Sequence, residues 1–147
     1  MTTQTLYTTN TVNFSKGESC QIRRYDYVLD FTVASVTNGD VLKIIALPKG
    51  SYVVGTLVTI NTAATASTTM SVGDSGSGTR YSTTLDITQA AGTLIAPAVY
   101  TAHAYTAADY ISVTVAGASP TAGKVTISAL VVDMSGLTHL PAGVASL

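Results

Sequence analysis

Residues 27–50 read YVLDFTVASVTNGDVLKIIALPKG, and this stretch decides the fold. From Tyr27 to Val33 every second residue is apolar, and the residues between them include aspartate and threonine. An apolar residue at every second position is typical of a β-strand that buries one face. The triplet Asn38-Gly39-Asp40 then favours a turn, because Asn and Gly tolerate the positive φ angles that tight turns require.

The second half of the stretch predicts a strand of another kind. Val41–Leu47 is apolar at every position except Lys43, which indicates a strand buried on both faces. Pro48-Lys49-Gly50 then ends this strand as a turn. Further strands are expected around the apolar sets Tyr52, Val54, Val58 and Ile60; Met70 and Val72; Ile111, Val113 and Val115; and Val125 and Ile127.

Two segments depart from this simple pattern. After Ile127 the apolar positions change parity, since Leu130 and Val132 come next. A strand covered on both faces explains the change, and so does a β-bulge near Ala129. Residues Leu85–Ala91 are compatible with one helical turn.

Short strands dominate the pattern of the whole chain. About eight of them, spaced at roughly 8–15 residues and without a long helical period, predict an all-β fold. The expected architecture is an antiparallel β-sandwich that is jelly-roll-like and carries an extended N-terminal arm. We expect the arm to span residues 1–24, the sandwich domain residues 25–134 and a C-terminal tail residues 135–147.

Charge is scarce and unevenly placed. Charged residues make up 10% of the chain, well below the roughly 25% of an ordinary soluble domain. Lys16, Arg23 and Arg24 against Glu18 give the arm a charge of +2, whereas four basic residues against seven aspartates give the remainder −3. The net charge of −1 provides no field for nucleic acid, and the apolar runs are too short for a membrane span.

The N-terminal residues also bear on where the chain is made. Met1–Asn13 lacks the basic-then-apolar order of a signal peptide, which predicts synthesis in the cytoplasm without export. Cys20 is the single cysteine, so we expect no internal disulfide and no cysteine-based metal site.

One motif invites a catalytic interpretation. Gly73-Asp74-Ser75-Gly76 resembles the segment around the nucleophile of trypsin-like proteases. His103 and His139 both follow the serine, whereas in those proteases the histidine precedes it, and Ser77 stands where the motif requires a second glycine. The segment is better interpreted as a Gly-rich turn whose Asp and Ser cap backbone amides, so we expect no enzymatic activity.

Candidate metal ligands and clustered tyrosines are the remaining features that suggest a binding site. Asp74 and Asp86 are too far apart in the pattern for a calcium loop, and Cys20, His103 and His139 lack zinc-ligand spacing, so no cofactor or metal is expected. A tyrosine platform for a glycan or nucleic acid is the competing use of the aromatic residues. Core edges and subunit contacts are the favoured use of its candidates, which are Tyr81, Tyr100, Tyr105 and Tyr110.

Four segments carry a family resemblance. They are Asp40–Gly50, with the pattern D-V-x-x-x-x-x-L-P-x-G; Ala63–Asp74, ending in V-G-D; Asp109–Val115; and Thr121–Asp133, with T-A-G-K-V and A-L-V-V-D. In this order they resemble the capsid decoration, or cement, proteins of tailed bacteriophages. The resemblance covers about two thirds of the chain and leaves the N-terminal arm outside it.

The resemblance implies a specific function. It implies a jelly-roll-like, non-enzymatic protein, often a homotrimer, that is made in the host cytoplasm and binds the major capsid protein on the exterior of the virion. We expect the arm to make the attachment, with Lys16, Arg23 and Arg24 as candidate contacts to the capsid or to a neighbouring subunit. The alternatives are a receptor- or glycan-binding domain of a phage fibre or spike, and a tail or neck structural protein.

Overall fold

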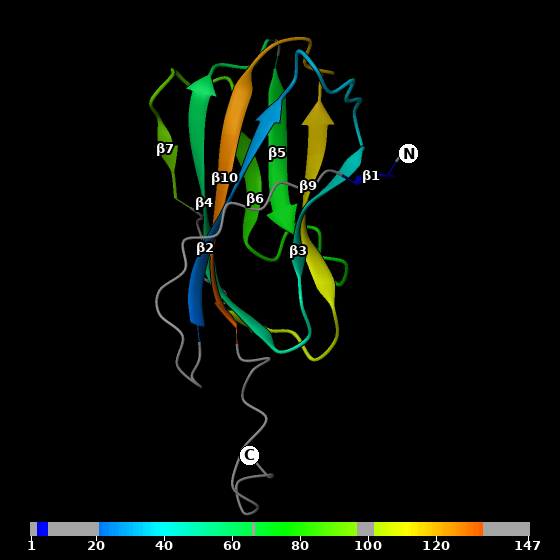
Figure 1. Ribbon diagram of the computed structural model, residues 1–147. Coiled ribbons are helices and arrows are strands. Elements are labelled where there is room, and N and C mark those ends of the chain that lie inside the picture. The colour runs from blue at the N-terminus through cyan, green and yellow to red at the C-terminus, as the bar shows by residue number, and fades with distance from the viewer. Residues whose placement is uncertain (1–2, 6–20, 66, 97–101, 134–147) are drawn as a thin grey trace, which may run out of the picture.

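The computed structural model describes residues 3–5, 21–65, 67–96 and 102–133, and in these residues it contains ten strands and no helix (Figure 1). The strands are β1 (Thr3–Thr5), β2 (Gln21–Asp30), β3 (Val41–Leu47), β4 (Ser51–Thr62), β5 (Thr68–Gly73), β6 (Ser82–Asp86), β7 (Leu94–Ile95), β8 (His103–Ala104), β9 (Asp109–Gly117) and β10 (Lys124–Asp133). Accordingly, no described helix is long and apolar enough to cross a membrane.

The strands form two sheets that pack face to face. One sheet has the order β1-β3-β9-β5-β6, and the other has the order β2-β10-β4-β7, with β8 also paired to β4. From β2 to β5 each successive strand lies in the opposite sheet, and β5 and β6 form the hairpin that closes this circuit. This connectivity is that of a jelly roll, so the predicted all-β antiparallel sandwich is confirmed.

The first strand is the exception to antiparallel pairing. β1 runs parallel to β3, with Thr3 opposite Val41 and Thr5 opposite Lys43, and it forms one edge of its sheet. β2 forms the corresponding edge of the other sheet and begins at Gln21. The strand therefore includes the last four residues assigned to the arm, while the division of the chain into arm, domain and tail stays a prediction.

The core lies between the sheets and is built from alternating positions of long strands. Leu29 of β2, Val113 of β9 and Ile127 of β10 are each at most 1% exposed. Each such aliphatic side chain contributes about 1.5–3 kcal/mol on burial, which stabilises the sandwich. The strands predicted from alternation around these residues are present.

The expected placement of Val33 beside the core is wrong. β2 ends at Asp30, whose carboxylate accepts hydrogen bonds from the backbone amide and the hydroxyl of Thr32. The chain turns there, so Phe31 still reaches the core whereas Val33 is 85% exposed. An aspartate that bonds to the backbone two residues later is a turn signal, and it overrides the alternation.

A β-bulge explains a second departure from the predicted faces. Against β10, Gly55 of β4 pairs with Leu130 and Val53 pairs with Val131, which leaves Val54 without a partner. The extra residue reverses the alternation of β4, so Val58 is buried while Val54 is 39% exposed. Tyr52, Val54 and Val58 therefore do not share one face as the alternation predicts.

The same bulge corrects the interpretation of the last strand. β10 pairs with β2 in continuous register from Lys124 to Asp133, so it does not bulge against that strand. Its buried positions keep one parity through Ala129 and Val131, and Leu130 lies on the outer side at 42% exposure. The irregularity predicted near Ala129 therefore lies in β4, opposite Leu130 and Val131. The side of β10 away from the core is not fully covered by the described residues.

The helical turn predicted for Leu85–Ala91 is also wrong. Leu85 and Asp86 end β6, and the chain then turns. The Asp86 carboxylate accepts hydrogen bonds from Thr88, through its amide and its hydroxyl, and from the side-chain amide of Gln89. These bonds satisfy the backbone locally in a turn and compete with a helix.

Candidate interaction surface

Arg23 and Arg24 lie on opposite sides of the sheet formed by β2, β10 and β4. Arg23 shares its side with the buried Tyr25, and its guanidinium lies 3.9 Å from the Asp133 carboxylate. Arg24 faces outward, and its side chain is 63% exposed. Strand alternation thus separates the two arginines, which adjacency in the sequence suggests as one contact, and Lys16 lies outside the described residues.

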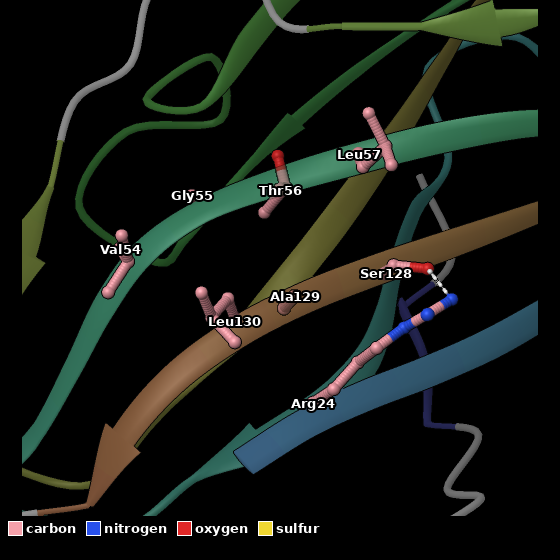
Figure 2. A pocket seen from close by; sticks show the side chains of 8 residues that line it. All are labelled: Arg24, Val54, Gly55, Thr56, Leu57, Ser128, Ala129 and Leu130. Carbon is pink, nitrogen blue, oxygen red and sulfur yellow. Dashed lines mark hydrogen bonds between the residues drawn. The ribbon is translucent and has the colours of Figure 1, made fainter. Parts of the chain in front are cut away.

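Arg24 is held in a defined position on the outer side. Its Nε donates to the Asp26 carboxylate at 2.8 Å, and its Nη2 donates to the Ser128 hydroxyl of β10 at 3.3 Å. The guanidinium is thus spread along the surface, because it bonds to its own strand and to the neighbouring one. It forms one wall of a groove (Figure 2).

The groove runs between the three strands and has a volume of about 380 Å³. The bulge and the composition of the strands create it, since Gly55, opposite Leu130, has no side chain, and Ser128 and Ala129 of β10 are small. Figure 2 shows Leu130 beside the Val54–Leu57 segment, with Arg24 on the other side of β10. The lining residues are Arg24, Val54, Gly55, Thr56, Leu57, Ser128, Ala129 and Leu130.

The side of this sheet that faces away from the core, which we call the outer face, concentrates exposed apolar side chains. Ile22 is 57% exposed, Leu130 42% and Val54 39%, and the strand registers group them, because Ile22 lies opposite Val132 and Val54 is the bulge residue beside Leu130. Val28, 49% exposed, lies further along β2, opposite Thr126. A cluster of this kind on a protein surface marks an interaction site more often than scattered single residues do. The sequence signal for it was the alternation of Ile22, Arg24 and Val28 with the buried tyrosines.

The charges on the outer face are paired with one another. Lys124 contacts Asp30 at 2.8 Å, as Arg24 contacts Asp26. The hydrogen bond from Lys124, together with those from Thr32, lowers the pKa of Asp30 to about 2. The face therefore presents apolar side chains among charges that already have partners.

The segment that resembles a protease nucleophile forms a polar network with Asp74 at its centre. The Asp74 carboxylate accepts hydrogen bonds from the amides of Gly76 and Ser77, at 3.0 and 2.8 Å. It also pairs with the Arg80 guanidinium and accepts the Tyr105 hydroxyl at 2.7 Å. The interpretation of Asp74 as a turn residue that caps backbone amides is confirmed.

Burial and hydrogen bonding oppose each other in this network. Burial acts to raise the pKa of Asp74, but the hydrogen bonds from Tyr105 and Arg80 outweigh it, and the pKa is lowered overall. Burial raises the pKa of Tyr81 to about 12 and also raises that of Tyr105. Both phenols therefore keep their protons at neutral pH, so they act as hydrogen-bond donors here.

The contacts of Ser75 and His103 do not bring the two side chains together as a catalytic pair would require. The Ser75 hydroxyl donates to the Asp109 carboxylate at 2.8 Å. His103 packs edge-on against the Tyr105 ring, with 4.8 Å between the ring centroids. His139 lies outside the described residues.

The tyrosines proposed as a stacking platform serve other purposes. The Tyr81 and Tyr105 hydroxyls are hydrogen-bonded to each other, and the residues are 1% and 5% exposed. Tyr110 lies under the Lys43 ammonium, which is 3.9 Å from its ring centroid. Tyr100 lies outside the described residues. For Tyr81 and Tyr105 the core interpretation is confirmed.

The two aspartates considered as calcium ligands already have hydrogen-bond or ion-pair partners. Asp74 is engaged by Arg80 and Tyr105, and Asp86 by its own turn. In the described part of the chain, no three His, Cys, Asp or Glu residues come together as a metal site would require. Cys20 and His139 belong to the residues outside it.

Comparison with known proteins shows the fold. No protein-family model matches the chain, and no curated protein matches its sequence. A chain of the "Cyanophage Pam1 capsid asymmetric unit" matches with a TM-score of 0.60 and 19% identity, covering 82% of this chain and 91% of that one. A chain of the "Capsid of Ralstonia phage GP4" matches with a TM-score of 0.59 and 18% identity, covering 84% and 90%.

A third similar structure extends the comparison. It is the "Acidic stable capsid structure of Helicobacter pylori bacteriophage KHP30", with a TM-score of 0.50, 23% identity and coverage of 74% of this chain and 86% of that one. The jelly-roll sandwich is therefore shared, over 74–84% of this chain, with chains found in three phage capsid structures.

Proposed function

We propose that the chain is a non-enzymatic structural protein of a phage virion, which binds the outer surface of the capsid and reinforces contacts between subunits of the major capsid protein. The observation that carries the proposal is the shared fold, because the similarity spans about nine tenths of the Pam1 and GP4 chains. Coverage of 82–84% of this chain and 90–91% of those chains favours the same kind of component over a domain borrowed by a larger protein.

The chemistry of the outer face supports binding to a protein surface. Burial of the apolar side chains of Ile22, Val28 and Leu130 in an interface is favourable in free energy. The neighbouring charges keep their partners when the face is covered. Burial of an unpaired charge costs several kcal/mol, whereas a paired and hydrogen-bonded one avoids most of this cost. A low-charge surface of this kind suits extensive contacts across subunit boundaries.

The start of β2 and the end of β10 lie at one end of the sandwich, which is where we place the attachment. Gln21 at the start of β2 pairs with Asp133 at the end of β10, and Asp133 also pairs with Ser51 of β4 (Figure 1). The two strand ends are therefore side by side, whereas Thr3–Thr5 of the arm pair with β3 in the other sheet. We propose that the arm and Arg24 contact the shell from this end, and that Arg23 supports the strand through Asp133 instead.

Binding to purified capsids that lack the protein tests the proposal. The full chain is expected to bind in many copies per particle and to raise the temperature at which the heads break. Arg24→Glu and a chain without residues 1–20 are expected to bind at least tenfold more weakly. Thr83→Glu, which adds a negative charge at an exposed position of β6 in the opposite sheet, serves as the control and is expected to bind normally.

The outcomes separate this function from its alternatives. Gel stoichiometry of intact particles that gives only a few copies indicates a fibre, spike, tail or neck position and contradicts the reinforcing role. Sedimentation of the free protein tests the proposed homotrimer. Unchanged occupancy after Arg24→Glu and after removal of residues 1–20 contradicts the proposed attachment, even if the capsid location is correct.

A further inference from the structure

The edge of β2 that faces away from β10, which we call the far edge, differs from the other edges of the two sheets. β2 has ten residues, contains no proline and pairs with β10 in continuous register. The strands at the other edges are short or irregular, since β1 has three residues, β7 and β8 have two each, and β6 has five with a register shift against β5. Among the described residues no strand pairs with the far edge (Figure 1). A long, regular edge strand is a template for a strand of another chain.

The backbone of β2 offers hydrogen-bonding groups to the far edge at every second residue. One step beyond the register of β2 and β10, the Phe31 amide donates to the Gly123 carbonyl at 3.0 Å. Because successive residues of an antiparallel strand bond to opposite sides, the odd-numbered residues of β2 bond to β10. The even-numbered residues therefore point their amides and carbonyls to the far edge; they are Ile22, Arg24, Asp26 and Val28.

The sequence of this strand is complementary to itself. Two copies that pair antiparallel at their far edges place even-numbered residues opposite each other. When a two-fold axis passes through Tyr25, Arg24 of each copy lies opposite Asp26 of the other. In the same register Ile22 of each copy lies opposite Val28 of the other. Opposite charges and apolar side chains that face each other across neighbouring strands stabilise a sheet.

Other registers lose this match. The backbone groups at the far edge allow the pairing to shift only in steps of two residues along one strand. A step in one direction puts Asp26 opposite Asp26, and a step in the other direction puts Arg24 opposite Arg24. Like charges directly opposite each other destabilise a sheet. The two charges therefore select the register with the axis at Tyr25.

The outer face continues across such a contact. A two-fold axis perpendicular to the sheet keeps the outer faces of both copies on the same side. Arg24 already bonds to Asp26 of its own chain at 2.8 Å, so pairing brings two ion pairs together with their signs alternating. The exposed side chains of Ile22 and Val28 cover each other at both ends of the contact. Burial of this apolar area is favourable in free energy.

We infer that two copies of the chain pair antiparallel through the far edge of β2, with the axis at Tyr25, and so join their sheets into one continuous sheet. A two-fold contact of this kind closes as a dimer, and it competes with the homotrimer that the family resemblance implies. The inference goes beyond the proposed function, because it concerns the free protein and is measured without capsids.

Disulfide cross-linking tests the register. Ile22→Cys together with Val28→Cys, in a Cys20→Ser background, is expected to give a covalent dimer on mild oxidation. Within one strand the two positions are about 20 Å apart at roughly 3.3 Å per residue, which is too far for a disulfide. Across the axis they are opposite each other, with about 5.5 Å between Cα atoms. Each single-cysteine variant is a control and is expected to stay a monomer on a denaturing gel, because identical positions are about 20 Å apart across the axis.

Charge variants test the pairing in solution. Arg24→Asp puts carboxylates opposite each other at two places, so sedimentation is expected to show self-association weakened about tenfold or more. Arg24→Asp combined with Asp26→Arg restores opposite charges between identical copies and is expected to dimerise like the unmodified chain. The same double variant is expected to form no mixed dimers with the unmodified chain, because like charges then face each other. Leu94→Asp, at an exposed residue of β7 on the opposite side of the sheet, is the control and is expected to dimerise normally.

Several outcomes overturn the inference. They are sedimentation of the unmodified chain as a monomer or a trimer, equal association of the Arg24→Asp variant and the double charge variant, and cross-linking of a single-cysteine variant. A monomer that binds capsids contradicts this inference and leaves the proposed function intact. A dimer that does not bind capsids contradicts the proposed function and leaves this inference intact.

Discussion

Tyr105 joins parts of both sheets, and removal of its hydroxyl is expected to lower the free energy of unfolding. Its backbone exchanges hydrogen bonds with Gly50 and Ser51 at the start of β4, while its side chain reaches Asp74 and Tyr81 of the other sheet's β5–β6 connection. Because the single Tyr105 proton goes to the Asp74 carboxylate, Tyr81 must donate to Tyr105. The two hydroxyls therefore form a chain with one direction.

This direction sets the size of the effect. Tyr105→Phe removes a hydrogen bond to a charged group, worth about 1.5–3 kcal/mol, and leaves the buried Tyr81 hydroxyl without an acceptor. We expect a loss of about 3 kcal/mol in the free energy of unfolding. Tyr81→Phe removes one neutral hydrogen bond, so its expected cost is about 1 kcal/mol.

The double variant provides the sharpest check. With both hydroxyls removed, no unsatisfied Tyr81 hydroxyl remains, so the combined cost is expected to be about 2 kcal/mol, which is less than that of Tyr105→Phe alone. Urea denaturation with a constant m-value measures all three, and a melting temperature lower by about 6–12 °C is expected for Tyr105→Phe. Equal costs for the two single variants, or costs that simply add in the double variant, would refute the proposed direction of the hydroxyl chain.

Four further variants test three separate features by the same denaturation assay. Asp30→Asn should make the free energy of unfolding less dependent on pH in acid. The lowered Asp30 pKa of about 2 stabilises the fold above pH ~4, and this contribution disappears as the pH falls toward 2. A variant whose free energy of unfolding still falls as steeply with pH as that of the unmodified chain contradicts the ion pair. Gly123→Ala should cost about 3 kcal/mol, because φ is +123° and the new Cβ would lie 2.6 Å from the Ala64 Cα, and a neutral result would show that the loop yields. Ile127→Ala should cost about 3 kcal/mol and Leu130→Ala less than about 1 kcal/mol, and comparable costs would contradict the assignment of inner and outer positions on β10.

The strands were predictable from the sequence because they depend on local alternation and on turn residues. β9 coincides with a run in which the side-chain alternation and the flanking turns agree, and β3 coincides with an apolar run that is bounded by turns. The faces of β4 were not predictable, because the bulge at Val54 is defined by the residues on either side of it. Gly55 and Val53 pair with consecutive residues of β10, which is far away in the chain. A reversal of alternation within one strand has no local signature of its own.

The candidate site was predictable in composition but not in geometry. Arg23 and Arg24 attract notice as adjacent cations, yet their separation follows from the start of β2 at Gln21. Extending the alternation of the buried Tyr25 backward by two residues would have placed Arg23 on the inner side. The groove beside Leu130 needed three strands in register, which no single stretch of sequence contains.

The last described strand completes its sheet from the middle, since β10 lies between β2 and β4 and pairs with both. During synthesis, β2 and β4 have no partner between them until residues 124–133 have been made. Folding must then bring Gln21 beside Asp133, and pairing over such sequence separations is slow and exposes unpaired strand edges meanwhile. A premature stop codon that removes residues 124–133 is therefore expected to yield a chain that does not fold, rather than a shortened protein with part of its function.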